Sequence, residues 1–138
     1  MIPDWWPDLV ARVKQHEGCV LRPYRDSVGV LSIGYGRNLE DVGISQAEAE
    51  LLLTHDLTRA WAAVQAWDWT AALSPARQQV LIEMAYNLGP RRLMGFGRML
   101  AAVKAGDYAT AADEMLNSRW RGQVGQRAVT LAEAMRRG

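Results

Sequence analysis

Two carboxylic acids near the start of the chain, Glu17 and Asp26, have the types and the spacing needed to hydrolyse a glycosidic bond. That reaction needs one protonated carboxyl group, which gives its proton to the leaving oxygen, and one ionised carboxylate, which activates water or attacks carbon. Glu17 precedes a glycine that ends a predicted helix, so the negative end of the helix dipole raises the cost of ionising it. Asp26 falls in a predicted turn, where solvent keeps it charged, and the hydroxyl of Ser32 would hold a water beside it.

The alternative is that both groups are solvated surface charges. The chain has 15 acidic residues, so pairs at this spacing arise by chance. Spacing alone therefore leaves the catalytic interpretation open.

The elements that would position the two carboxyl groups are a helix and a small sheet. Apolar residues recur at helical spacing from about Pro7 or Asp8, with Asp4 or Asp8 as the expected N-cap, and Gly18 stops the helix. Between residues 20 and 39, β-branched and aromatic residues mix with turn formers, a pattern typical of short antiparallel strands.

The chain after residue 43 is predicted to be helical. Ser45 and Glu48 form a capping box, which begins a long helix that ends near Gln65. Start and stop signals predict four more helices, over residues 74–88, 96–105, 107–116 and 125–136.

These elements predict a single domain with a mostly helical α+β fold. We expect a small antiparallel β-lobe at residues 18–43 and a larger α-helical lobe at residues 1–17 and 44–138, joined by the long helix. A cleft between two such lobes is a common place for a ligand.

The composition excludes several other classes of protein. The net charge of +1 disfavours a nucleic-acid binder, and no apolar run reaches the length of a membrane span. One cysteine allows no internal disulfide, and no Cys/His cluster has metal-ligand spacing, so we expect neither metal nor cofactor. Residues 87–138 carry nine basic and four acidic residues, which either meet an anionic polymer such as a cell wall or form solvated helix faces.

The segment around the two carboxyl groups resembles the active-site signature of the phage lysozymes, or endolysins, of glycoside hydrolase family 24. In that pattern Glu-Gly is followed by Asp, with eight residues between the two acids, then by Thr six residues later and by Ile-Gly-x-Gly-His. Glu17, Asp26 and Ser32 stand at the three reactive positions. The flanking motifs keep the family order over nearly the whole chain: His16-Glu17-Gly18, Tyr24-Arg25-Asp26, Ser32-Ile33-Gly34-Tyr35-Gly36-Arg37-Asn38, Gln46-Ala47-Glu48, Gly95-Phe96, Asp107-Tyr108, Ser118-Arg119-Trp120 and Arg127-Ala128.

The resemblance implies a lysozyme-like fold and cleavage of the β-1,4 bond between N-acetylmuramic acid and N-acetylglucosamine in peptidoglycan, with inversion of configuration. It implies that Glu17 protonates the leaving group while Asp26 and Ser32 position a water. It also implies that Arg127 pairs with Glu17. Contacts to the substrate are expected at Asn38, Tyr86, Asn87 and Arg127.

The chain departs from the family pattern at two of these positions and in one segment. Ser32 replaces Thr and keeps the hydroxyl without the methyl that restricts its rotamer. Arg37 replaces His, and we expect it to form an ion pair with Asp56 that ties the sheet to the long helix. Few residues separate Asn38 from Ser45, so the cleft is expected to be more open there.

Two other functions remain as alternatives: a lytic transglycosylase, which needs Glu17 but no second carboxylate, and a non-catalytic wall-binding module of the same fold. The chain opens without the basic and apolar regions of a secretory signal. We therefore expect a monomer made in the cytoplasm of a bacterial host that reaches the wall after holin-type release.

Overall fold

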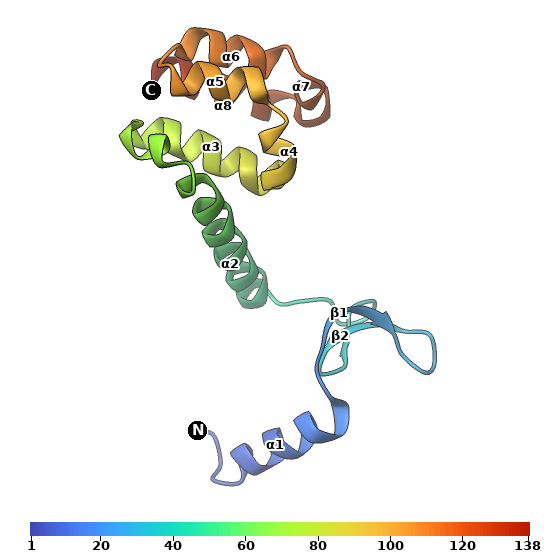
Figure 1. The fold of residues 1–138 in the computed structure, drawn as a ribbon. Helices are drawn as coiled ribbons and strands as arrows, with labels where there is room; N and C mark the ends of the chain where they lie inside the picture. The colour runs from blue at the N-terminus through green and yellow to red at the C-terminus, as the bar shows by residue number, and fades with distance from the viewer. The chain divides into compact units, whose positions relative to one another are not determined.

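Two compact units, Met1–Glu50 and Leu51–Gly138, make up the chain in the computed structural model, which describes residues 1–138 (Figure 1). The first unit holds α1 (Trp6–Glu17), β1 (Val20–Arg25), β2 (Leu31–Gly34) and β3 (Arg37–Asn38). Helix α2 (Gln46–Gln65) contains the boundary between the units. The second unit continues with η1 (Asp68–Ala72), α3 (Pro75–Leu88), α4 (Pro90–Met94), α5 (Gly97–Lys104), α6 (Tyr108–Leu116), α7 (Arg119–Val124) and α8 (Gln126–Arg137). This order confirms the mostly helical α+β fold, whereas the lobe limits at residues 18–43, 1–17 and 44–138 stay a prediction.

Helix α1 ends where the sequence predicts and begins differently. Gly18 takes a φ of 68°, and its N–H donates to the carbonyl of Lys14, which closes the last turn after Glu17. The N-cap residue is Trp5, which makes no side-chain cap hydrogen bond, so the prediction that Asp4 or Asp8 caps the helix is wrong. Asp8 lies inside the first turn, where its charge complements the helix dipole instead.

The sheet is antiparallel, as predicted, with the strand order β1-β2-β3. Ser32 on the central strand β2 lies opposite Tyr24 on β1 and Asn38 on β3. The register shifts between Val20 and Tyr24, the stretch that contains Pro23, which has no N–H to give to the ladder. The central position buries Ser32, which is only 3% exposed.

The start of α2 is fixed by the predicted capping box. Glu48 Oε1 accepts from the Ser45 N–H at 2.8 Å, and Ser45 Oγ accepts from the Glu48 N–H at 3.1 Å. Arg37 on β3 also reaches Glu48, with Nη2 2.7 Å from Oε2, and donates to the Gly43 carbonyl. The Arg37 and Ser45 hydrogen bonds lower the pKa of Glu48 to about 2.

Arg37 ties the sheet to the long helix, but the predicted partner is wrong. The carboxyl group it contacts belongs to Glu48, and Asp56 forms an ion pair with Arg59 on its own helix. Glu48 lies in the first turn of α2, whereas Asp56 is about 12 Å further along the helix axis at a rise of about 1.5 Å per residue. The first turn is therefore the part of α2 that the short loop after β3 brings to Arg37.

The second unit follows the predicted helix signals except for its short elements. Ser74 Oγ accepts from the Arg77 N–H and begins α3, and Asp107 accepts from the N–H of Thr110 to begin α6. The Thr110 hydroxyl also donates to Asp107, and both hydrogen bonds lower the pKa of that carboxyl group. The elements η1, α4 and α7, each of five or six residues, were not predicted because one turn of helix shows no apolar period.

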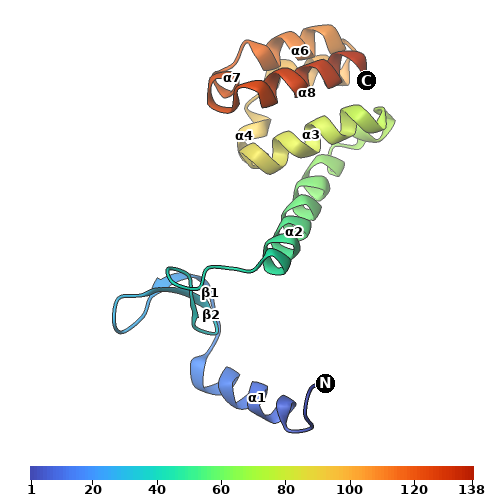
Figure 2. The same ribbon diagram turned by 180° about the vertical axis from the view of Figure 1, so that it is seen from behind.

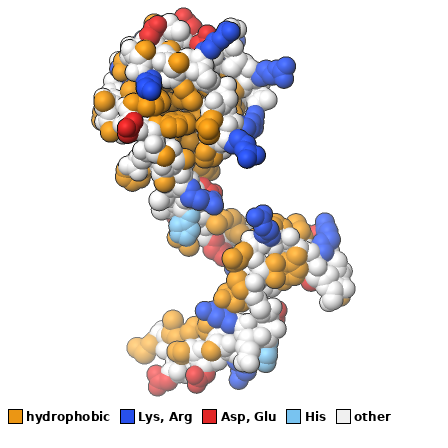
Figure 3. All heavy atoms as spheres, in the orientation of Figure 1, with side chains coloured by type: hydrophobic (Ala, Val, Ile, Leu, Met, Phe, Trp, Pro, Cys, Tyr) orange, Lys and Arg blue, Asp and Glu red, His pale blue; other side chains and the backbone are white.

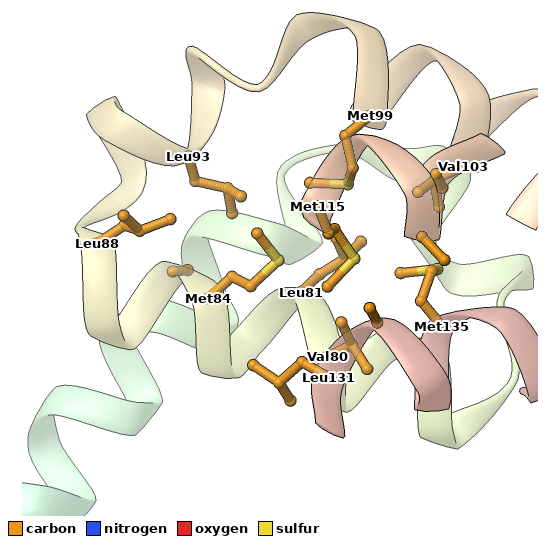
Figure 4. Close-up of a cluster of buried hydrophobic side chains, with 14 of the residues drawn as sticks. Val80, Leu81, Met84, Leu88, Leu93, Met99, Val103, Met115, Leu131 and Met135 are labelled. Atoms are coloured by element: carbon orange, nitrogen blue, oxygen red, sulfur yellow. The ribbon is translucent and has the colours of Figure 1, made fainter. Parts of the chain in front are cut away.

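The hydrophobic core lies in the second unit. Helix α6 packs against α5 and α8, and α3 packs against α4 and α8 (Figure 2). The side chains at the centre have no exposed surface and come from four helices, α3, α4, α6 and α8: Leu81, Met84, Leu93, Met115 and Met135 (Figure 4). Methionine is unbranched and fills irregular gaps between helices that meet at several angles.

Arg77 holds the end of the chain to this core. Its Nε donates to the Met135 carbonyl at 2.7 Å, and its Nη2 donates to the Arg136 carbonyl at 3.0 Å. The guanidinium group also lies 3.5 Å from the centre of the Tyr108 ring. One side chain at the start of α3 therefore satisfies two unpaired carbonyl groups of α8 and contacts α6.

Candidate active site

Glu17, the last residue of α1, lies against the turn between β2 and β3. A Cβ atom placed on Gly36 in this turn would be 3.0 Å from Glu17 Oε2. The ammonium group of Lys14, one turn earlier on α1, lies 5.6 Å from the centre of the Tyr35 ring in the same turn. The carboxyl group of Glu17, an exposed residue, therefore lies next to the sheet.

Asp26 follows β1 and organises the turn that leads to β2. Its Oδ1 accepts from the N–H groups of Val28 and Val30, both at 2.9 Å, and its own N–H donates to the Val30 carbonyl. An aspartate that bonds to backbone groups two and four residues further on is a strong turn former. These bonds fix the direction of the carboxyl group and leave Oδ2 without a partner in the unit.

Ser32 is linked to Asp26 through one residue. Its hydroxyl donates to the Val30 carbonyl at 3.3 Å, and the N–H of Val30 donates to Asp26. With its one proton used in this bond, the Ser32 hydroxyl can still accept a hydrogen bond from a water molecule. The predicted water between Ser32 and Asp26 stays a prediction.

Asn38 uses its side chain within the loop that follows β3. Its Nδ2 donates to Asp41 Oδ2 at 3.1 Å, and its Oδ1 accepts from the Asp41 N–H at 2.9 Å. Its carbonyl also accepts from the N–H groups of Val42 and Gly43. The side chain thus shapes the short loop, and its contact with a substrate stays a prediction.

Tyr86 and Asn87, at the end of α3, line one hollow of about 570 Å³ in the second unit. Tyr86 is 40% exposed. Asn87 Oδ1 accepts from Trp120 Nε1 at 2.8 Å, and Trp120 is buried. Since an indole nitrogen only donates, this bond assigns the oxygen of the Asn87 amide and leaves its NH₂ group for a ligand. Asp56 and Arg59 on α2 also line the hollow.

Arg127 on α8 forms an ion pair within the second unit. Its Nε donates to Glu83 Oε2 on α3 at 2.8 Å. The partner implied by the resemblance, Glu17, belongs to the first unit, so that pair stays a prediction. Of the expected site residues, the structure groups Glu17, Asp26 and Ser32 around one sheet and Tyr86 and Asn87 in one hollow.

Comparison with known proteins shows the family to which the chain belongs. The family model described as phage lysozyme matches residues 14–137. The chain belongs to the phage lysozyme family. It is similar to the SAR-endolysin of Escherichia phage Mu, with 31% identity over 127 residues that cover 84% of this chain and 72% of the relative. It is also similar to the probable T4-type lysozyme 1 of Dictyostelium discoideum, with 26% identity over 146 residues that cover 84% of this chain and 86% of the relative.

Membership in the phage lysozyme family confirms the resemblance drawn from the motifs. It supports a role in breaking down bacterial peptidoglycan and a glycosidase or peptidoglycan hydrolase activity. No helix has both the length and the hydropathy needed to cross a membrane, and no three His, Cys, Asp or Glu side chains gather as metal ligands would.

Sequence reasoning missed a cationic hollow of about 640 Å³ in the second unit of this lysozyme-family chain. Arg92, Arg98 and Arg119 line it from three different helices, and Phe96 and Trp120 form part of its wall. Neither Arg98 nor Arg119 makes a hydrogen bond or ion pair in the unit. Lys and Arg side chains project from the side of the unit that carries α4 and α7 (Figure 3). The basic excess of residues 87–138 was the available signal, but it did not say which residues converge.

Proposed function

We propose that the chain hydrolyses the β-1,4 bond between N-acetylmuramic acid and N-acetylglucosamine, with Glu17 as general acid and Asp26 as general base. The proposal depends on one observation: both carboxyl groups border the same small sheet. The Glu17 carboxyl group lies against the turn between β2 and β3, and Asp26 follows β1, the strand that pairs with β2. Two carboxyl groups on one ordered support are what this reaction requires.

In the proposed reaction, Glu17 gives its proton to the glycosidic oxygen as the bond from that oxygen to the anomeric carbon breaks. A water molecule attacks the anomeric carbon from the opposite face and passes one proton to Oδ2 of Asp26. Ser32 accepts the second O–H of the water, because its own proton is used on the Val30 carbonyl. With both O–H bonds engaged, a lone pair of the water is directed at carbon, and the configuration is inverted.

The hollows of the second unit support a peptidoglycan substrate. The NH₂ group of Asn87 suits the acetamido carbonyl oxygens that both sugars carry, and the exposed ring of Tyr86 suits a sugar face. The arginines of the cationic hollow suit the carboxylates of the peptide stems. Asn38 and Arg127 belong to the same proposal as substrate contacts.

The biological setting is part of the proposal. The phage Mu relative is named an endolysin, which supports action on the host cell wall. Release through a holin-type pore is a further part of the proposal. The net charge of +1 supports a protein without a nucleic-acid partner. We expect it to act as a monomer, without membrane insertion, metal or cofactor.

Digestion of purified peptidoglycan, followed by mass spectrometry and by NMR of the first products, tests this function. The account predicts reducing muramic acid ends that form first as the α anomer, because a β bond is cleaved with inversion. Ends of the 1,6-anhydro type would assign a lytic transglycosylase, and first products in the β form would indicate a covalent intermediate. Binding to walls without any cleavage product would assign the non-catalytic module.

A further inference from the structure

Gly36 is the one glycine of the chain at which an added Cβ atom would meet a candidate catalytic group. Gly36 has a φ of +83°, and a Cβ atom there would lie 3.0 Å from Glu17 Oε2 and 3.6 Å from its carboxyl carbon. Gly34, two residues earlier, has a similar φ of +71°, but a Cβ atom there would have no atom within 4 Å. The two glycines share a positive φ and differ in what a side chain would meet.

We propose that Gly36 is a positioning residue for the Glu17 carboxyl group. Glu17 makes no hydrogen bond or ion pair within its own unit, and its Oε2 occupies space that a Cβ atom at residue 36 would crowd. This inference rests on the proposed role of Glu17 as general acid. Gly36 acts only through Glu17 and takes no part in the chemistry itself.

Crowding of Glu17 by a methyl group at residue 36 should change the stability of the fold little and the rate of the reaction strongly. Oε2 is the far end of a flexible side chain, so Glu17 relieves an added methyl group by turning its χ angles. The group that moves is the carboxyl group proposed to give the proton. A displacement of about 1 Å in a reacting group lowers the rate by roughly 100-fold. A methyl group at residue 36 should therefore act on catalysis far more than on folding.

Gly34→Ala is the matched control, because it imposes the same positive φ on alanine without touching Glu17. Both Gly36→Ala and Gly34→Ala should lose a similar free energy of unfolding, measured with urea. With peptidoglycan fragments as substrate, Gly36→Ala should lose about 10- to 100-fold in kcat with little change in KM, and Gly34→Ala should stay within about threefold. The alkaline limb of the pH–rate profile, where a general acid loses its proton, should move in Gly36→Ala alone, because only that variant changes the surroundings of the acid.

A double-mutant cycle gives an independent readout. Glu17→Asp withdraws the carboxyl group from residue 36, so its loss of kcat should be smaller in the Gly36→Ala background than in wild type. In the Gly34→Ala background the two losses should multiply.

Three results overturn the inference: equal kcat losses in the two alanine variants, multiplicative losses at residues 17 and 36, or a Gly36→Ala variant that is unfolded while Gly34→Ala folds. The last result would mean that the fold, rather than the Glu17 carboxyl group, takes up the contact. Full activity of Glu17→Gln would instead reject the proposed function. An inactive Glu17→Gln together with any of the three results above rejects the role of Gly36 alone.

Discussion

Asp26 has two roles, one in the turn and one in the chemistry, and two substitutions separate them. Oδ1 accepts two backbone hydrogen bonds of 2.9 Å, and the proposed base is the other oxygen, Oδ2. Asn at this position keeps an oxygen acceptor for the turn but has no site that takes a proton from water. Ala removes both the turn acceptor and the base.

The size of the effect follows from these contacts. A net contribution of about 1 kcal/mol per hydrogen bond, and more when the acceptor is charged, gives about 2–4 kcal/mol for the two bonds lost in Asp26→Ala. Asp26→Asn keeps both bonds in neutral form and should lose less than about 1 kcal/mol. Both variants should lose about 100- to 10,000-fold in kcat, the usual value of a general base.

Urea unfolding measures the first quantity, and the initial rate of wall digestion at saturating substrate measures the second. The two variants should differ in stability and agree in activity. Asp26→Ala with the stability of wild type would refute the turn role. Asp26→Asn with activity within about tenfold of wild type would refute the role as base, because amides do not accept protons near neutral pH.

Three further predictions concern contacts outside the proposed chemistry. Arg77→Met removes two hydrogen bonds to the end of α8 and a cation–π contact. It should lower the free energy of unfolding by about 2–4 kcal/mol in thermal or urea unfolding, and Arg77→Lys should fall in between. A loss below about 0.5 kcal/mol would contradict the role of Arg77. The pKa of Glu48 is about 2 in the folded chain against 4.5 ordinarily, so its pair with Arg37 stabilises the fold fully above about pH 4.5. The stability difference between wild type and Arg37→Gln should therefore shrink as the pH falls from 4.5 toward 2, and a difference that does not change with pH would count against the pair. Arg98→Gln combined with Arg119→Gln should raise KM for walls and weaken its dependence on salt; unchanged salt dependence argues that the cationic hollow does not meet the substrate.

The sequence predicted the helix starts and stops that depend on neighbouring residues. Ser45 and Glu48 form the capping box that was expected, and Ser74 and Asp107 cap the helices that they precede. The stop at Gly18 was also correct. These predictions held because a cap bonds to the backbone two or three residues away, a distance that sequence alone specifies.

Contacts between distant residues could not be predicted in the same way. Arg37 was assigned to the wrong acid because the sequence shows that a cation and several acids exist, but not which turn of α2 the loop after β3 reaches. The three arginines of the cationic hollow come from α4, α5 and α7, and two of these helices were not predicted. The approach of Gly36 to Glu17 likewise depends on how α1 meets the sheet.

The candidate site was located by type and spacing, with help from the motifs. Residue type, spacing and motifs point to Glu17, Asp26 and Ser32, and the structure arranges the three around one sheet. The motifs did not explain why Gly36, the second glycine of the signature, is a glycine. A glycine in a sequence shows only that a side chain is absent.

The role of Glu17 as the acid can be measured by the clearing of purified bacterial walls by wild type and by Glu17→Gln. Glu133→Gln is the matched control, because it makes the same change at an exposed ion pair on α8. The account predicts that Glu17→Gln keeps the circular dichroism spectrum and unfolding midpoint of wild type but loses at least about 100-fold in clearing rate, while Glu133→Gln clears walls normally. Clearing by Glu17→Gln at the wild-type rate would contradict the assignment of Glu17 as the acid.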